Sequence, residues 1–139
     1  LHVGAGTFRP MDCASAREHT MHAEWVSVSR DALLALLQAV QEERPIVPVG
    51  TTAMRTLESC VDTDGMLHPA TGPTDIFLKP GDRLRATDAL VTNFHLPESS
   101  LFMLVCALMG TDVMQAAYAH AIKQEYRFYS YGDACLLLP

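Results

Sequence analysis

The stretch ALVTNFHLPESSLFMLV, residues 89–105, contains a strand pattern, a polar loop and a strongly apolar helix pattern in immediate succession. ALVTN is typical of a short strand, and Ser99 or Ser100 can cap a helix that Gly110 would end. The loop between them, TNFHLP at residues 92–97, is polar. Polar groups between a strand and a helix project from the rim of an α/β sheet, where ligands usually bind. We therefore expect a ligand site at this rim.

The rest of the chain alternates between helical and strand-like patterns. Apolar spacing and capping residues predict helices at 30–44, 53–59, 100–109 and 116–124, and strands at 46–50, 75–79, 89–93 and 126–131. Thr51 or Thr52 is expected to cap the second helix and Asp112 the fourth. Residues 61–73 have the composition of a surface loop, and PGD that of a turn. Such alternation favours an α/β fold with substantially parallel strand pairing.

Composition describes an ordinary globular protein without general affinity for nucleic acid. The 139 residues are 49% hydrophobic and 19% charged, which is sufficient for one core. The net charge of -6 gives no overall attraction to a phosphate backbone, so any such contact must be local. The chain begins LHVGAG without an initiator methionine and stops at LLLP. We interpret it as part of a longer protein.

Cysteine spacing and hydropathy bear on the cellular setting. The four cysteines form no CxxC pair, so neither a zinc site nor a disulfide framework is indicated, and a reduced, cytoplasmic setting fits best. Cys106 lies in LFMLVCALM and is expected in the core. No apolar run reaches the ~18 residues of a membrane span, and no signal peptide is recognisable.

The segment HTMHAEW holds two imidazoles and a carboxylate within six positions, namely His19, His22 and Glu24. With His95 from the polar loop these groups could form a divalent metal site, which would indicate a metal-dependent hydrolase. The alternative is acid–base chemistry by His22, Glu24 and His95, because imidazole titrates near neutrality, with a pKa of ~6.5. A third possibility for His95 is a purely structural hydrogen bond within its loop.

Two small-residue segments could approach an anionic or ribose-bearing ligand. GAGT, from Gly4 to Thr7, offers backbone N–H groups with little obstruction, although a simple turn explains it equally. VGTT places Thr51 and Thr52 at a predicted helix N-terminus, which can hold a carboxylate or phosphate or can be a plain N-cap.

The segment YRFYSYGD, residues 126–133, interleaves three tyrosines with an arginine. Such an arrangement can stack on unpaired nucleobases. The same residues could instead pack a terminal strand. Both interpretations remain open at the level of sequence.

Taken in order, six segments resemble the S-adenosylmethionine:tRNA ribosyltransferase-isomerase family of queuosine biosynthesis. They are LHVGAGTFRP, HTMHAEW, VGTTAMRTLES, TDIFLKPG, ALVTNFHLPESSLFMLV and YRFYSYGDA. The match runs over nearly the whole chain, apart from the helix around residues 33–41 and the loop around residues 62–69. The departures are small: Ser100, Ala53 and Cys135 stand where threonine, serine and methionine are usual. None of them removes a group with an expected role in chemistry.

The resemblance implies a fold and a domain assignment. Members of the family are considerably longer, so residues 1–139 would be the C-terminal portion of an α/β barrel-like catalytic domain. The family's small inserted β-barrel domain would be absent from this chain. An upstream part of the same protein would complete the site, and the 139 residues alone are expected to be inactive.

The resemblance also implies a reaction. The ribosyl moiety of S-adenosylmethionine is transferred and isomerised onto 7-aminomethyl-7-deazaguanine at the wobble position of tRNA, which leaves epoxyqueuosine and releases adenine and methionine. S-adenosylmethionine is thus a consumed co-substrate, no further cofactor and no metal is expected, and tRNA is the macromolecular partner. The other possibilities are the metal-dependent hydrolase and a non-catalytic fragment that binds RNA or a partner.

Within this resemblance, His22 or His95 would be the base or acid, and Glu24 would orient an imidazole or stabilise the sulfonium. The expected substrate contacts are Gly4, Gly6, Thr7, His19, Thr51, Thr52, Arg55, Asn93, Arg127 and Asp133. The small residues and threonines would lie at the adenosyl and methionine groups. Arg55 and Arg127 would hold the methionine carboxylate or an RNA phosphate.

Overall fold

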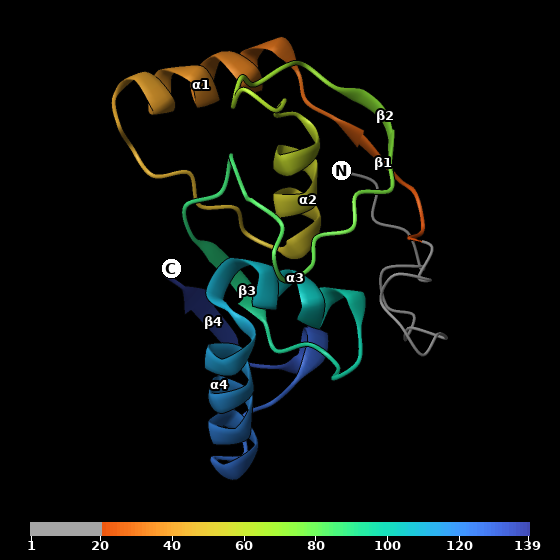
Figure 1. Ribbon diagram of the computed structural model, residues 1–139, viewed down its shortest axis with the longest axis vertical. Coiled ribbons are helices and arrows are strands. Elements are labelled where there is room, and N and C mark those ends of the chain that lie inside the picture. The colour runs from red at the N-terminus through yellow and green to blue at the C-terminus, as the bar shows by residue number, and fades with distance from the viewer. Residues whose placement is uncertain (1–20) are drawn as a thin grey trace.

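The computed structural model describes residues 21–139, and these form a mixed α/β structure (Figure 1). The elements are β1 (Glu24–Ser27), α1 (Arg30–Gln41), α2 (Thr51–Ser59), β2 (Thr71–Thr74), β3 (Leu90–Asn93), α3 (Ser100–Met109), α4 (Thr111–Lys123), the 3-10 turn η2 (Tyr129–Tyr131) and β4 (Ala134–Leu137). In Figure 1, α1 and the β1–β2 pair lie in the upper half, α4 and the β3–β4 pair lie in the lower half, and α2 lies between them. The expected mixture of helices and strands is confirmed.

Within residues 21–139 the strands form two small antiparallel sheets, so the expected parallel pairing is wrong for both of these ladders. β1 pairs with β2 and β3 pairs with β4. In the part of the chain that the structure describes, parallel pairing is found at the bridge between Val49 and Val91. The predicted strand at 46–50 is reduced to this bridge, where Val91 N–H donates to Pro48 O at 3.0 Å. Pro48 has no N–H to donate in return, which keeps this segment short.

Two other strand predictions are displaced along the chain. Residues 75–79 form no regular strand, and β2 lies just before them, where it overlaps the end of the predicted loop at residues 61–73. The predicted strand at 126–131 is instead a loop that contains η2, and β4 follows it. Tyr129 has a left-handed backbone, with φ of 61°, which is incompatible with a continuous strand.

Helix starts are set by glycine as often as by a polar side chain. The cap of α3 by Ser99 is confirmed, since its Oγ accepts the Phe102 N–H at 3.2 Å. The other two expected caps are wrong, because Gly50 precedes α2 and Gly110 precedes α4, both without a side-chain cap. Gly110 has φ of 87°, so it ends α3, as expected, and begins α4 directly.

Two helices end in Schellman motifs with glutamate in the left-handed position. In α4, Tyr126 N–H donates to Ala121 O at 2.9 Å, and Glu125 has φ of 58°. In α1, the corresponding residue is Glu43 with φ of 53°. Glycine is preferred at this position, because a side chain is strained there. The left-handed turn at Glu43 also explains why α1 ends at Gln41 and not at residue 44.

The larger core lies between α3, α4 and the β3–β4 pair, and α2 contributes to it. Its most buried side chains are Met54, Leu90, Leu104, Val105 and Met114. Cys106 is buried in the same core, as expected. A smaller cluster, composed of Leu33, Cys60, Leu67 and Ala86, joins α1 to the segments around the end of α2.

One face of the β3–β4 sheet carries apolar side chains that are exposed to solvent in the structure of residues 21–139. Val49, Val91 and Leu136 are direct cross-strand neighbours and therefore share a face. Val49 is 73% exposed and Leu136 is 57% exposed. Val47 and Leu138, two positions along, are exposed as well. We call these five residues the apolar sheet face.

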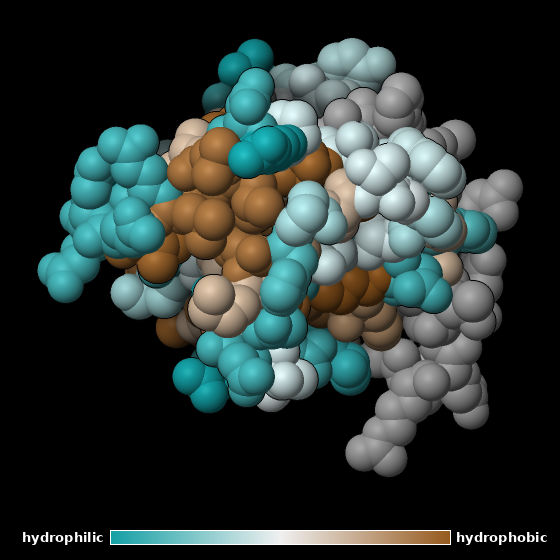
Figure 2. Space-filling view, turned by 90° about the horizontal axis from the view of Figure 1, so that it is seen from above, coloured by the Kyte–Doolittle hydropathy of each residue, from teal (hydrophilic) through white to brown (hydrophobic). Residues whose placement is uncertain are grey.

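A second exposed apolar region belongs to α1. The molecule seen from above shows brown hydrophobic areas between teal polar side chains (Figure 2). The helix α1 lies at the top in Figure 1, and its Leu34 and Val40 are exposed.

Among residues 21–139 no single helix is long and apolar enough to cross a membrane, although α3 and α4 together pass that test as a pair bent by 117°.

Candidate functional site

A buried arginine connects three segments beside α2. Arg55 projects from α2, and its Nη1 donates to a carboxylate oxygen of Glu24 in β1. Its Nε donates to Ile76 O at 3.1 Å, and its Nη2 lies 3.5 Å from His22 O. Arg55 is 2% exposed and Glu24 is 3% exposed. The HAEW segment is therefore fastened to α2 by an ion pair inside the protein.

Burial and charge act in opposite directions on this arginine. Desolvation lowers the pKa of Arg55 from its ordinary 12.5, and the nearby carboxylates of Glu24 and Asp75 raise it. Arginine has so high an intrinsic pKa that the guanidinium stays charged. Because its donors are directed at groups of the protein itself, Arg55 is built to hold the segment of His22 and Glu24 in place.

The N-terminus of α2 lies beside β3. Gly50 N–H donates to Val91 O at 2.8 Å, and this bond places the start of α2 against β3. Thr51 and Thr52, the first residues of the helix, are buried there. The predicted contacts at VGTT and at the end of β3 are thus neighbours in the fold, although about 40 residues separate them in sequence.

His95 is buried in the loop after β3 and is held from two sides. Its Nε2 is hydrogen-bonded to Thr92 Oγ1 at 3.0 Å, and its backbone N–H donates to the Tyr118 hydroxyl at 2.9 Å. Burial lowers the pKa of His95 to about 4. The imidazole is therefore neutral at neutral pH. Tyr118, whose pKa burial raises to about 12, is also uncharged.

The polar end of β3 continues into the loop before β4. Asn93 Nδ2 donates to Asp133 O at 3.3 Å, and Asp133 forms an ion pair with Arg127 at 3.1 Å. This ion pair raises the pKa of Arg127 and lowers that of Asp133. Three predicted contact residues are therefore linked to one another and to the loop of His95.

Some of the other predicted site residues lie within the described residues and some lie outside them. Gly4, Gly6, Thr7 and His19 lie outside the described residues. His22 is exposed, while its backbone oxygen faces Arg55. Within residues 21–139, no three His, Cys, Asp or Glu side chains are arranged to hold a metal ion. The predicted metal set included His19, so that part of the hypothesis falls outside the structure.

Sequence reasoning missed Tyr118 and the environment of Arg55. Tyr118 is 23 residues from His95 and sits in a helix, so no local pattern connects the two. An arginine in sequence alone suggests an anionic ligand, whereas its partner Glu24 lies 31 residues away. Both contacts, Arg55 with Glu24 and His95 with Tyr118, arise from the tertiary fold and leave no local signal in the sequence.

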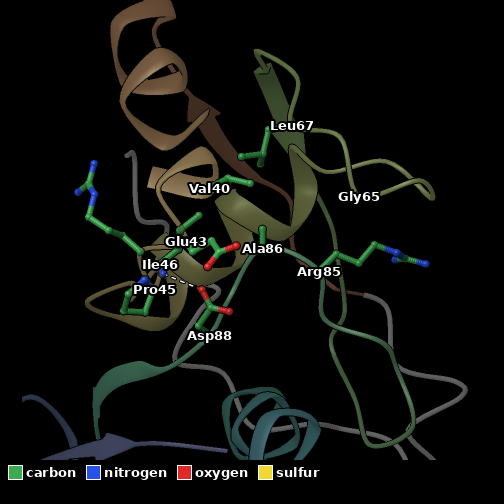
Figure 3. A pocket seen from close by; sticks show the side chains of 10 residues that line it. Val40, Glu43, Pro45, Ile46, Gly65, Leu67, Arg85, Ala86 and Asp88 are labelled. Atoms are coloured by element: carbon green, nitrogen blue, oxygen red, sulfur yellow. Dashed lines mark hydrogen bonds between the residues drawn. The ribbon is translucent and has the colours of Figure 1, made fainter. Parts of the chain in front are cut away.

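A pocket of about 420 Å³ lies elsewhere, between the end of α1, the 61–67 turn and residues 85–88 (Figure 3). Its lining includes Glu43, Arg44, Ile46, Arg85 and Asp88, and the Asp88 carboxylate accepts the Ile46 N–H at 2.7 Å. Its lining includes none of the predicted site residues that lie within residues 21–139. We place the candidate site at α2 and the loop after β3, because both carry buried polar side chains and Gly50 N–H joins the start of α2 to β3.

Buried polar side chains at the helix and loop ends beside a strand are typical of an α/β protein with a ligand site at its sheet rim. The particular family follows from comparison with known proteins. The chain belongs to the family described as queuosine biosynthesis protein, which matches residues 1–137. The resemblance deduced from the six sequence segments is thereby confirmed.

Curated relatives share this similarity over the whole chain. The chain is 65% identical over 139 residues to an S-adenosylmethionine:tRNA ribosyltransferase-isomerase of Hyphomonas neptunium. It is 58% identical over 137 residues to the protein of that name from Maricaulis maris. These alignments include 100% and 99% of this chain but 40% and 39% of the relatives, so the chain spans about two fifths of their length.

A solved structure agrees with the fold. The crystal structure of S-adenosylmethionine tRNA ribosyltransferase from Thermotoga maritima superimposes with a TM-score of 0.77 at 42% sequence identity. The match covers 82% of this chain and 40% of that one.

Proposed function

We propose that the full-length protein containing this chain transfers and isomerises the ribosyl moiety of S-adenosylmethionine onto 7-aminomethyl-7-deazaguanine at the tRNA wobble position. The product is epoxyqueuosine, with adenine and methionine released. The observation that carries this proposal is the family match over residues 1–137, together with relatives of 58–65% identity that bear the enzyme's name. The unpaired Cys60, Cys106 and Cys135 support a reducing, cytoplasmic setting.

The chemistry requires a base near the sulfonium and a hydrogen-bonding group near the purine. The positive sulfur acidifies the adjacent 5′ carbon, so that a positioned base can remove a proton from it. We assign His22 as this base, because its side chain is exposed and Arg55 fixes its backbone. Glu24 acts indirectly, by orienting that segment through Arg55.

His95 serves in this proposal as a neutral hydrogen-bonding group. Its pKa of about 4 makes it a weak base at neutral pH, and Thr92 holds its Nε2. Contacts to the adenosyl and methionine groups come from the two small-residue segments. The residues in this role are Gly4, Gly6, Thr7, Thr51 and Thr52, together with His19. Asn93, Arg127 and Asp133 border the RNA side of the site.

The whole enzyme is needed to complete this site. We propose that these 139 residues are the C-terminal portion of an α/β barrel-like catalytic domain, which an N-terminal part of the same protein completes. The apolar sheet face supports this, because relatives are about two and a half times longer and Val49 and Leu136 are uncovered here. The isolated 139-residue chain should self-associate in analytical ultracentrifugation, and Val49→Ser/Leu136→Ser should reduce that association. A strictly monomeric isolated chain would contradict the proposal.

The reaction is tested with full-length enzyme, S-adenosylmethionine and precursor tRNA. Mass spectrometry of the nucleosides should show the added ribosyl mass, with equimolar adenine in solution. His22→Gln should lower kcat by about 10²- to 10⁴-fold, as expected for loss of a general base. Leu34→Ala, an exposed change on α1, is the matched control and should leave kcat unchanged. Near-normal turnover by His22→Gln would refute its assignment, and tRNA binding without adenine release by wild-type enzyme would refute the reaction.

A further inference from the structure

The loop at residues 126–133, which we call the tyrosine loop, turns aromatic rings toward solvent. Tyr131 is 87% exposed, and Tyr126 and Tyr129 are 44% and 43% exposed. The phenylalanine of the same loop does the opposite, because the Phe128 ring lies 5.2 Å from that of Phe94, next to the core. Among the described residues, ring contacts are made by Tyr126 but not by Tyr129 or Tyr131. The Phe128 ring therefore anchors the loop, and the rings of Tyr129 and Tyr131 are available to a ligand.

The loop is held in a defined shape by its own hydrogen bonds. Arg127 N–H donates to Asp133 Oδ2 at 2.8 Å, and Asp133 N–H donates to Arg127 O at 2.9 Å. Gly132 closes the turn so tightly that a Cβ there would lie 2.2 Å from Arg127 O. The exposed rings are therefore presented on a preorganised backbone. The loop loses less conformational entropy when a ligand binds than a flexible loop would.

The tyrosine loop adjoins the candidate site directly. Tyr129 N–H donates to Phe94 O at 2.9 Å, and Phe94 lies between Asn93 and His95. Asn93 in turn donates to Asp133 O. A ligand that stacks on the loop would thus lie next to whatever occupies the loop after β3.

The chemistry of the loop fits unpaired nucleobases better than a protein surface. Protein interfaces surround their aromatic residues with apolar contacts, whereas Tyr131 is flanked by Ser130 and Gly132 and lies near the Arg127–Asp133 ion pair in sequence. Every base has an apolar face that stacks on tyrosine. The Arg127 charge is balanced by Asp133 and the chain carries -6 overall, so stacking and not phosphate attraction would dominate.

We propose that the tyrosine loop stacks on unpaired bases of the RNA substrate that flank the modified nucleotide, with Tyr131 as the principal platform. This inference rests on the proposed function, since it names how that substrate is held. Affinity for RNA must depend on the ring of Tyr131 and not on its hydroxyl, and the dependence on salt must be unaffected by losing the ring.

The test uses full-length enzyme and an unmodified anticodon stem-loop RNA, with fluorescence anisotropy at several salt concentrations. Tyr131→Ala should weaken binding by about 5- to 150-fold, the range for losing one base–aromatic stack, while Tyr131→Phe stays near wild type. The slope of log Kd against log salt should be the same for wild type and Tyr131→Ala. Gly132→Ala keeps all three tyrosines and should also weaken binding, because it displaces the loop. Leu34→Ala is the exposed apolar control.

The outcomes separate this inference from the reaction itself. If wild-type enzyme modifies tRNA but Tyr131→Ala binds the stem-loop within twofold of wild type, stacking is overturned and the reaction stands. If Tyr131→Ala changes the oligomeric state and leaves RNA affinity unchanged, the loop contacts protein and the inference is overturned. If wild-type enzyme neither binds the stem-loop nor releases adenine, the proposed function fails and this inference fails with it.

Discussion

Replacing Arg55 by methionine in the full-length protein should destabilise it strongly. The substitution removes a guanidinium that is 2% exposed and deprives the Glu24 carboxylate, 3% exposed, of the Arg55 countercharge. It also removes the donor to Ile76 O. Removing one partner of a buried ion pair costs about 3–5 kcal/mol, because the remaining charge stays desolvated. We therefore expect the free energy of unfolding to fall by that amount.

The assay is urea unfolding of wild type, Arg55→Met, Glu24→Gln and the double variant. The double variant should be less destabilised than the two single variants combined, with a coupling of about 1–3 kcal/mol, because neutralising Glu24 relieves the stranded charge. Arg44→Met is the matched control: Arg44 pairs with Glu42 on the surface and should change stability by less than about 1 kcal/mol. A loss below 1 kcal/mol for Arg55→Met, or strictly additive effects, would refute the reasoning.

Three further outcomes are expected. The folded-state pKa of His95 is about 4, against an ordinary 6.5, so the unfolded chain binds more protons than the folded chain between these pH values. The contribution of His95 to the free energy of unfolding should therefore be complete above pH 6.5 and fall by about 3 kcal/mol as the pH drops to 4. Urea midpoints of wild type and His95→Gln across this range check it, and identical pH dependence would contradict it. Glu125→Gly should raise stability by about 0.5–1 kcal/mol by relieving the left-handed strain at φ of 58°, whereas Glu125→Ala should not; thermal unfolding distinguishes them. Ser99→Ala should cost about 1 kcal/mol, because it removes the cap of α3, while Ser99→Thr should retain most of it.

Features that depend on neighbours in the chain were predictable. The helix at residues 100–109 follows from its apolar run, from the Ser99 cap and from the stop at Gly110. The turn after residue 79 follows from PGD, and Asp82 N–H donates to Lys79 O there. Hydrogen bonds of caps and turns join residues only three or four positions apart, so a short stretch of sequence is enough to predict them. The family, too, was deduced from short ordered segments and is confirmed by the comparisons.

Strand pairing could not be read in this way. An alternating or apolar run can form a strand in either direction, and its partner depends on which distant segments meet. Residues 126–131 alternate well, yet Tyr129 bonds to Phe94 and turns the chain, and the strand forms at Ala134–Leu137. Threonine at the start of α2 resembled a cap, but Gly50 is fixed by β3 and occupies that position.

The amino-acid sequence by itself determined the family, the helices and the polar loop at residues 92–97. Tertiary structure alone decided the antiparallel direction of both sheets and the burial of Arg55 against Glu24. It also decided the neutral state of His95 and the outward tyrosines beside it. The physical reason is that charge state and exposure depend on solvent, and solvent is excluded by residues far away in the chain. His95 is an ordinary histidine in sequence, and only the packing around it lowers its pKa to about 4.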